Sequence, residues 1–387
     1  MKLLKFLYLL TFLVHLGDHI IIPLLPILLT INKNLAFSQV GFILGLGALA
    51  FQIGSLSGGF LSDIIGRKII LFIGGAIEIF SLVGYGLSNS YILFIIFEVL
   101  LNIGGGLISP TIKAGISSIA QTTNTDETKA FSKRGVAAHL GVAIGGLIPI
   151  IVISNHFPTF FIIAACVYAV FFLLLIFVPI KGKTKHKHIS NNKNYLRILH
   201  DKPFIIFSII TLFIWAIYAQ LNLLLPLRAA YILKNKKTIG SIFSIMSLSI
   251  VLLQTLITKL FLRKFNTYTS LCIGTISMGL ALFLMGLSNS YIFLVGSTIV
   301  FAIGVMFNTP SIDSEISKMV KEGLDGTYYS ISNIIFGVGS ALGNFMGGQL
   351  VSIYGIDNFT FWLFIFLFSL FIFLLIIISK KYMLRNI

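Results

Sequence analysis

Long apolar runs separated by short polar breaks fill this 387-residue chain, and they constrain its fold more than any other feature. A helix that crosses the hydrocarbon core of a bilayer needs about 20 apolar residues. Of all residues, 57% are hydrophobic and only 10% are charged, whereas soluble domains carry about 25% charged residues. Too little polar surface remains for a water-soluble fold. The sequence therefore predicts an all-α, multi-pass membrane protein rather than two or three soluble domains.

The runs and their breaks predict twelve transmembrane helices. They group into an N-terminal six-helix bundle (1–179), a basic cytoplasmic linker (180–202) and a C-terminal six-helix bundle (203–387). The first run continues to about Ile31 without a small-residue cleavage site, so we expect it to stay in the mature protein as a helix. The predicted helices span residues 6–31, 38–61, 69–87, 91–119, 134–153, 159–179, 203–232, 240–262, 268–287, 291–317, 327–353 and 359–379.

The positions of Lys and Arg predict the orientation of the chain in the cell membrane. Cytoplasmic loops of membrane proteins are enriched in these residues. With both termini in the cytoplasm, most of the 28 Lys and Arg lie inside. The outer loops then hold only Lys33, Lys234, Lys236 and Lys237. The net charge of +16 is therefore interpreted as a topology signal and not as a nucleic-acid-binding surface.

The two halves repeat each other in sequence. Residues 86–92 read GLSNSYI, and residues 286–292 read the same. Pro26 and Pro110 recur as Pro226 and Pro310 in the same register. Because six helices separate the copies, both have the same orientation in the membrane. Such a parallel repeat occurs in a large class of transporters, whose substrate path lies between the halves near the bilayer midplane.

The loop between the second and third predicted helices reads GFLSDIIGRK from Gly59 to Lys68. Gly59 and Gly66 favour close helix approach and a tight turn. Asp63, at the membrane edge, can accept a hydrogen bond from Arg67 or cap a neighbouring helix. The loop resembles the signature G-x-L-a-D-r-x-G-r-k of the major facilitator superfamily, without its mid-motif basic residue. The resemblance implies two rocking halves and a conformational switch at this loop.

Two further helices resemble the drug–proton antiporter branch of that superfamily. The first helix has its G-x5-P-x2-P spacing from Gly17 to Pro26. The fifth helix partly resembles its signature G-x3-G-P-x2-G from Gly141, with Gly146 in place of the proline. In the fourth helix, Glu98 stands where the family has a buried arginine associated with proton transfer, so that role is not transferred to this chain.

Ionisable residues inside membrane helices are kept mainly where they work or are paired. Asp18 lies deep in the first helix, and a buried carboxyl can carry a proton near neutral pH. His19 is a weaker candidate because neighbours on a helix point about 100° apart; a histidine bonded to a helix carbonyl is its alternative. Glu98 is the third candidate for proton coupling, because the family fold places the fourth helix at the cavity. Glu78 is equally deep but lies in the third helix, which that fold places peripherally.

The seventh helix carries four candidates for substrate binding. Aromatic and amide groups on an apolar wall suit a ligand that needs stacking and a few hydrogen bonds. Hydrogen bonds between helices are the alternative role for the same groups. The four residues are Trp215, Tyr218, Gln220 and Asn222.

Lys113 and Asp313 occupy equivalent positions of the repeat near the cytoplasmic ends of the fourth and tenth helices. We expect them to form a salt bridge that closes the inner side in one state. Interfacial placement of the two side chains without such a bridge is the alternative.

The sequence contains no phosphate-binding loop of the G-x4-G-K-[ST] type and no metal-ligand spacing. We therefore expect no enzyme activity, no cofactor and no metal, and an ion gradient as the energy source. The leading hypothesis is a monomeric, proton-coupled antiporter that exports small amphipathic molecules or drugs. A proton-coupled importer of a sugar, peptide or other nutrient is the main alternative, and a lipid flippase, an ion channel or a sensor are further ones.

Overall fold

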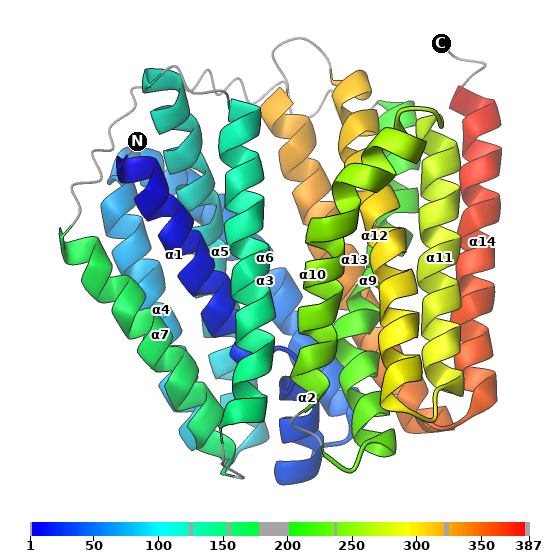
Figure 1. Ribbon diagram of the computed structural model, residues 1–387, viewed down its shortest axis with the longest axis horizontal. Helices are drawn as coiled ribbons and strands as arrows, with labels where there is room; N and C mark the ends of the chain where they lie inside the picture. The colour runs from blue at the N-terminus through cyan, green and yellow to red at the C-terminus, as the bar shows by residue number, and fades with distance from the viewer. Residues whose placement is uncertain are drawn as a thin grey trace. The chain divides into compact units, whose positions relative to one another are not determined.

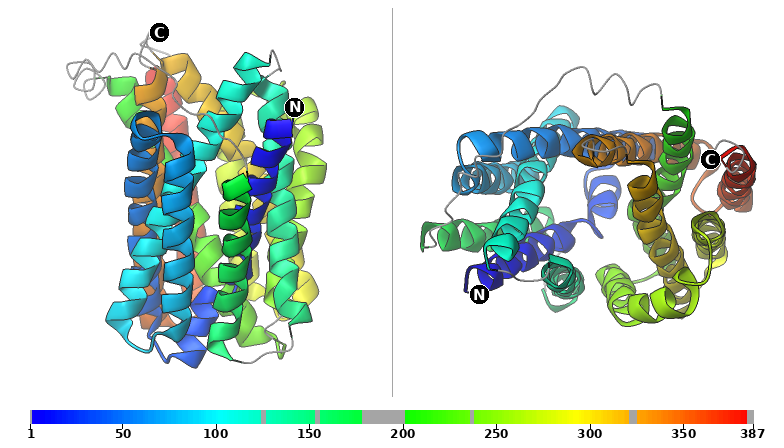
Figure 2. Two further views of the ribbon diagram at one scale, coloured as in Figure 1. Left: turned by 90° about the vertical axis from the view of Figure 1, so that its left-hand side faces the viewer. Right: turned by 90° about the horizontal axis from the view of Figure 1, so that it is seen from above.

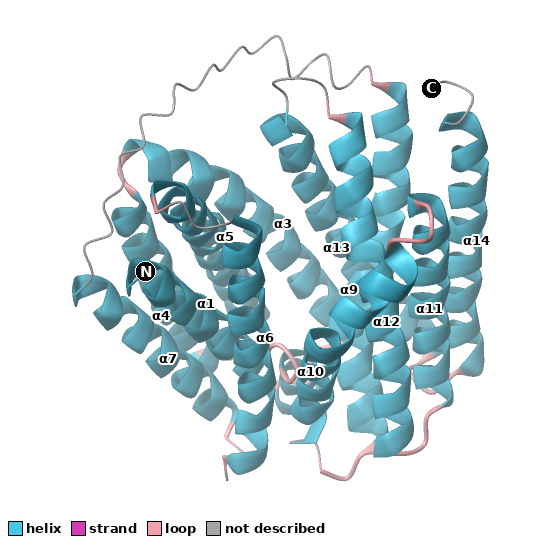
Figure 3. Ribbon diagram, turned by 45° about the horizontal axis from the view of Figure 1, so that its top comes forward, coloured by secondary structure: helices cyan, strands magenta, loops and turns pink. Residues whose placement is uncertain are grey.

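A computed structural model describes residues 2–123, 127–152, 156–177, 201–235, 238–320 and 325–383. In these residues every regular element is helical, and short loops join the helices (Figure 3). Twelve segments are long and apolar enough to cross a membrane. The predicted number of transmembrane helices is therefore confirmed. The predicted linker 180–202 lies outside the described residues except for its last two positions.

The chain divides into two compact units, and the first comprises residues 1–187 and 235–248. Its helices run side by side in Figures 1 and 2. They are α1 (Lys2–Ile21), α2 (Leu25–Ile27), a π-helical turn (Leu28–Asn32), α3 (Phe37–Ile64), α4 (Arg67–Leu87), α5 (Tyr91–Thr122), α6 (Glu127–Ile151), α7 (Phe157–Phe177) and the beginning of α10 (Ile239–Ile257).

The second unit comprises residues 188–234 and 249–387. It contains α9 (Lys202–Ile232), the rest of α10 with a π-helical turn (Thr258–Leu262), α11 (Thr267–Leu287), α12 (Tyr291–Met319), α13 (Asp325–Tyr354) and α14 (Phe359–Met383). Pro110 and Pro310, predicted as equivalent, lie inside α5 and α12 without ending either helix.

The predicted span 6–31 is present as Leu3–Asn32, but its helix is interrupted. α1 ends at Ile21, and a turn precedes α2. Pro23 and Pro26 explain the break, because proline has no amide hydrogen and its ring clashes with the preceding turn. The equivalent Pro226 lies inside an unbroken α9, so the two copies of this helix differ in shape.

Helix packing repeats between the two units and agrees with the predicted duplication. α1 packs against α5, α6 and α7, and α9 packs in the same way against α12, α13 and α14. α4 contacts α5 and α7, as α11 contacts α12 and α14. The repeated string GLSNSYI forms the turn after α4 and after α11, where Ser88 and Ser288 have the same extended conformation.

Large apolar side chains cover the outer faces of the helices. Phe177, Leu252 and Ile292 are 79%, 75% and 82% exposed. Soluble monomers rarely expose broad apolar patches, whereas lipid tails solvate such side chains. The exposed faces therefore fit a bilayer.

Candidate functional site

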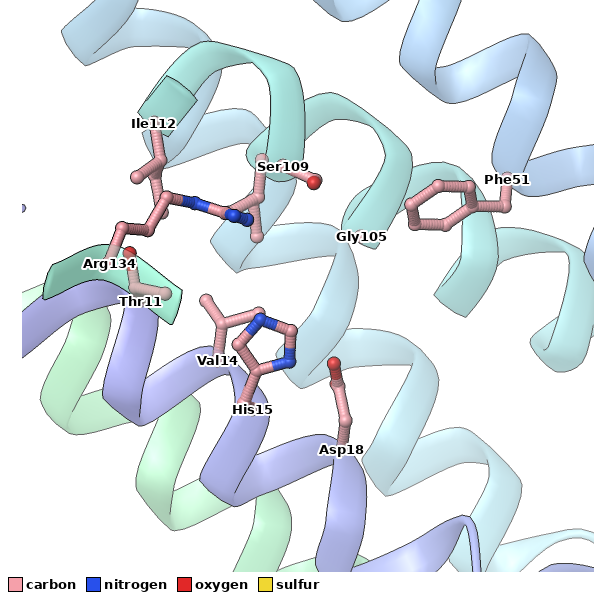
Figure 4. Close-up of a pocket in the computed structure, with 10 residues that line it drawn as sticks. Thr11, Val14, His15, Asp18, Phe51, Gly105, Ser109, Ile112 and Arg134 are labelled. Carbon is pink, nitrogen blue, oxygen red and sulfur yellow. The ribbon is translucent and has the colours of Figure 1, made fainter. Parts of the chain in front are cut away.

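A cavity of about 70 Å³ lies inside unit 1, between α1, α3, α5 and α6 (Figure 4). Drug-sized ligands occupy pockets of roughly 300–1,000 Å³. This cavity therefore suits a few water molecules or an ion and not a drug. Its lining residues are Thr11, Val14, His15, Asp18, Phe51, Gly105, Ile108, Ser109, Ile112 and Arg134.

Three ionisable side chains meet at this cavity. Asp18 and His15 are three residues apart on α1, so both lie on the same face of the helix and point into the cavity. Arg134 reaches in from α6 towards Ser109 (Figure 4). Its Nε is buried and has no hydrogen-bond partner among the described residues. The cavity thus brings an acid, a histidine and an arginine together inside the membrane region.

Tyr168 of α7 fixes the position of the Asp18 carboxyl. The tyrosine is fully buried, and its hydroxyl donates a hydrogen bond of 2.6 Å to Asp18 Oδ1. Gly17 makes room for the ring, since a Cβ there would lie 2.8 Å from Tyr168 Cε2. The glycine of the G-x5-P-x2-P pattern therefore allows the contact that holds Asp18.

Glu78 of α4 is a second buried carboxyl in unit 1. It is 2% exposed, and its Oε2 has no hydrogen-bond partner among the described residues. Gly104 and Gly105 of α5 leave space for it, because Cβ atoms there would lie 3.1 Å from Glu78 Cγ and Oε1, respectively. Gly105 also lines the cavity. One residue therefore separates the Glu78 carboxyl from the Asp18 cavity.

Glu98 of α5 is the third buried carboxyl, at 5% exposure. Asn102, one turn later, donates a hydrogen bond of 2.9 Å to its Oε1, while Oε2 has no partner in the described part of the chain. A Cβ atom on Gly47 of α3 would lie 2.6 Å from Glu98 Oε1, so this glycine leaves space for the carboxyl. Glu98 does not line the cavity that holds Asp18.

None of these three carboxyls forms an ion pair with any residue that the structure describes. A charged carboxylate without a partner costs several kcal/mol in the membrane interior. Protonation removes that charge. Unit 1 therefore offers groups that can gain and lose a proton without breaking a salt bridge.

His19 lies beside Asp18 in sequence but not at the cavity. Its Nδ1 is 3.1 Å from the carbonyl oxygen of His15, and its Cβ lies against Gly145 of α6. This is the carbonyl-bonded arrangement that was the alternative to a coupling role. Asp18 lines the cavity, whereas His19 is not among its lining residues.

Unit 2 holds an aromatic cluster around α9. The Trp215 ring of α9 lies 5.5 Å from Tyr218 and 4.8 Å from Phe336 of α13. Tyr218 also lies 6.2 Å from Phe301 of α12. Trp215 Nε1 is buried and has no acceptor among the described residues. Ring faces can stack against a flat organic molecule, and an indole N–H can donate a hydrogen bond to it.

Gln220 and Asn222, also predicted for substrate binding, differ in their surroundings. Gln220 is 7% exposed, and its amide donates a 2.6 Å hydrogen bond to the carbonyl of Gly343 in α13. It therefore joins two helices, as its alternative role predicted, although its Oε1 has no partner in the described residues. Asn222 is only partly buried on α9.

The repeat matches the three buried acids of α1, α4 and α5 with residues of different chemistry in unit 2. Positions 18, 78 and 98 correspond to 218, 278 and 298 in the register of the repeated string. The acids in unit 1 are Asp18, Glu78 and Glu98, and the counterparts in unit 2 are Tyr218, Met278 and Thr298. The duplicated halves have therefore kept their packing and changed their polar groups.

The signature loop between α3 and α4 contains one glycine that its backbone requires. Gly66 has φ 101°, a conformation that other residues rarely adopt, and it precedes α4 directly. By contrast, a Cβ built on Gly59 meets no described atom within 4 Å. The close helix approach expected at Gly59 is therefore wrong, whereas the tight turn expected at Gly66 is present.

The charged residues of the loop lie at the start of α4. Arg67 is buried at 5% exposure, and Lys68 donates a 3.2 Å hydrogen bond to the carbonyl of Ile176 near the end of α7. The side chain of Asp63 lies outside the described residues, so its predicted contact with Arg67 stays a prediction.

Lys113 and Asp313 are exposed, one on α5 of unit 1 and the other on α12 of unit 2. The salt bridge expected between them stays a prediction.

Sequence reasoning missed the partners of Asp18. His15 could have been found, because its spacing of three residues from Asp18 places both on one helix face. Tyr168 and Arg134 carry no such local signal, since they come from helices far along the chain. Only the packing of α6 and α7 against α1 brings them to the carboxyl. The described residues contain no cluster of three or more His, Cys, Asp or Glu that could hold a metal.

Comparison with known proteins identifies the family. The family model of the Major Facilitator Superfamily matches residues 7–343 and 221–385. The uncharacterized MFS-type transporter YqjV of Bacillus subtilis is 23% identical over 345 residues, which cover 86% of this chain and 82% of that protein. The quinolone resistance protein NorA of Staphylococcus aureus is 25% identical over 346 residues, covering 85% and 86%.

Solved structures share the fold. The nucleoside transporter NupG superposes with a TM-score of 0.83 at 17% identity, covering 99% of this chain and 100% of that one. The peptide transporter POT, in complex with sulfate, gives a TM-score of 0.81 at 15% identity, covering 99% and 94%. The predicted family and fold are confirmed: the chain belongs to the major facilitator superfamily of membrane transporters.

Proposed function

We propose that this transporter is an antiporter that exports small amphipathic molecules or drugs by alternating access and takes up protons in exchange. It acts in the cell membrane as a monomer with both termini in the cytoplasm. The observation that carries the proposal is the Asp18 carboxyl. It faces a cavity inside unit 1, accepts a hydrogen bond from Tyr168 and has no ion-pair partner among the described residues.

A proton-coupled carrier needs a group that binds a proton in one state and releases it in the other. A carboxylate in an apolar interior favours proton uptake because the neutral form avoids the cost of an unpaired charge. The cavity beside Asp18 has room for water, which can bring the proton. Asp18 therefore combines a carboxyl that favours proton uptake with a cavity through which water can reach it.

The aromatic cluster of unit 2 supports an amphipathic substrate. Trp215, Tyr218 and Phe336 offer ring faces, and the indole N–H offers a donor that no described group uses. Ring faces bind flat apolar molecules, and one polar group orients them. The similarity to a quinolone resistance protein supports a drug-like molecule in this role.

Purified protein in liposomes with an acidic interior tests the proposal. A pH dye inside reports proton efflux while a fluoroquinolone, a hydrophobic cation dye, a nucleoside or a dipeptide is added outside. We expect efflux driven by the drug or the dye, and its loss in Asp18→Asn. The matched control is Asp357→Asn, an exposed aspartate of unit 2.

The outcomes separate the candidate functions. Drug-driven efflux that persists in Asp18→Asn keeps antiport but moves the proton to another group, with Glu98 tested next. Uptake of a nucleoside, sugar or peptide together with protons would show that the protein is an importer. No response to any compound at any gradient contradicts proton coupling.

A further inference from the structure

A single tyrosine hydroxyl faces two buried carboxyls in unit 1. Tyr168 donates its hydrogen to Asp18 Oδ1 at 2.6 Å. The same hydroxyl lies within hydrogen-bonding reach of the Glu78 carboxyl, which belongs to a different helix, α4. A tyrosine hydroxyl donates one hydrogen bond and can accept others, so it can link a carboxyl that donates to one that accepts.

The surroundings of Glu78 leave it with few partners. α4 packs against α3, α5 and α7. The ionisable groups that act on Glu78 are Tyr168 of α7, Asp18 of α1 and Glu98 of α5. α3 carries no ionisable residue except Asp63 near its end. The charged groups that act on Glu78 are therefore carboxylates, and two ionised carboxylates close together would repel each other.

The packing of α4 against α5 leaves space for the Glu78 carboxyl. Gly104 and Gly105 leave a gap on α5 that the Glu78 side chain fills, and Glu78 Oε2 has no hydrogen-bond partner in the described residues. An unpartnered, buried carboxyl oxygen costs free energy unless protonation or a ligand satisfies it in some state. The helix packing therefore accommodates Glu78 and leaves its Oε2 atom without a partner in the described residues.

Resting on the proposed role of Asp18, we propose that Glu78, Tyr168 and Asp18 form one proton site, in which two carboxyls share a single proton through the tyrosine. When the proton is on Glu78, the acid donates to the Tyr168 oxygen and the tyrosine donates to the Asp18 carboxylate. When it moves, Tyr168 gives its hydrogen to Asp18 and takes the one from Glu78. One O–H bond breaks and one forms at the tyrosine, and the total charge stays at minus one.

This arrangement gives the proton two positions. Asp18 borders the cavity, whereas Glu78 lies behind Gly105. The proton enters and leaves at Asp18 and is held at Glu78, away from water. Tyr168 is the positioning residue that connects the two.

Tyr168→Phe and Glu78→Gln test the shared site in liposomes. Two rates are measured: transport driven by a pH gradient, and exchange of labelled for unlabelled substrate at equal pH, which needs no net proton movement. The probe is the compound that drives proton efflux in the wild type. We expect the gradient-driven rate to fall by about 10²–10⁴-fold, the range typical of proton-transfer groups, and exchange to remain within about twofold.

Tyr328→Phe is the matched control. Tyr328 of α13 is also fully buried, and it donates a 2.6 Å hydrogen bond to an aspartate, Asp201, in unit 2. Removing the Tyr328 hydroxyl breaks a tyrosine–aspartate hydrogen bond like that of Tyr168, but outside the proton site. We expect both rates to stay near the wild-type values in this variant.

The outcomes distinguish this inference from the proposed function. If Asp18→Asn loses gradient-driven transport but Tyr168→Phe and Glu78→Gln keep it, the shared site is refuted and antiport stands. Loss of both rates in Tyr168→Phe would show a purely structural tyrosine and would also overturn the shared site. If Asp18→Asn keeps gradient-driven transport, the shared site is refuted together with the proposed role of Asp18, and antiport then uses another proton-binding group.

Discussion

Arg228 of α9 is expected to hold the helix ends of unit 2 together. It is 5% exposed, and its Nη2 donates to the carbonyls of Gly286 at 2.6 Å and Ser288 at 3.2 Å. Longer bonds of 3.4 Å reach the carbonyls of Met285 and Ile356. The last carbonyls of a helix have no partner within it. Arg228 therefore satisfies carbonyls at the ends of α11 and α13 with a single side chain.

The substitution Arg228→Met keeps the length of the side chain and removes its donors. A hydrogen bond from a charged donor contributes about 1.5–3 kcal/mol, so the two shorter bonds contribute ~3–6 kcal/mol together. Removing a buried charge returns part of this free energy. We expect a net loss of about 3 kcal/mol, or a fall in Tm of ~6–12 °C for a unit of this size.

Thermal unfolding of the purified protein in detergent, followed by size-exclusion chromatography, measures this change. The Tm of Arg228→Lys should lie between those of the wild type and Arg228→Met, because a lysine keeps the charge but cannot reach several carbonyls with one planar group. Arg263→Met, at an exposed arginine of the same unit, is the control and should leave Tm unchanged. A Tm of Arg228→Met within 2 °C of the control, a threshold of about 1 kcal/mol, would refute this account of the helix ends.

Further substitutions test the packing and the site. Asp201→Ala should lower the stability of unit 2 by about 2 kcal/mol, because Asp201 caps α9 and accepts from Tyr328; urea or heat unfolding checks this. Gly343→Ala should destabilise, since its Cβ would meet the backbone of α9, whereas Gly59→Ala should stabilise by up to about 1 kcal/mol; parallel melting curves compare the two. Under the proposed function, Trp215→Leu should weaken substrate binding by about 1–3 kcal/mol without changing the number of protons exchanged, as equilibrium binding and pH-dye assays would show.

The number and approximate ends of the membrane helices followed from apolar runs, because a bilayer requires about 20 apolar residues whatever their order. The break before Pro23 did not, since the equivalent Pro226 lies in a continuous helix. Whether a proline breaks a membrane helix depends on which neighbours satisfy the freed carbonyls. Those neighbours are set by the tertiary packing of the helices, which the local sequence does not reveal.

The candidate site was predictable only in part. Asp18 stood out as a charge in an apolar run, and its depth was enough to single it out. Its hydrogen bond with Tyr168 joins residues 150 positions apart, which no spacing rule predicts. Glu78 was placed low because its helix is peripheral in the family fold. The glycines of α5 leave it the space to lie behind the cavity.

The different chemistry at equivalent positions of the two halves has a consequence for how such a protein can evolve. Acids occupy positions 18, 78 and 98, while the second copy has a tyrosine, a methionine and a threonine at the matching places. Under the proposed function, proton coupling depends on residues of one copy of the ancestral repeat, and substrate selectivity depends on residues of the other copy. Natural variation at the aromatic wall can then broaden or narrow the range of exported compounds while the coupling to protons is left intact.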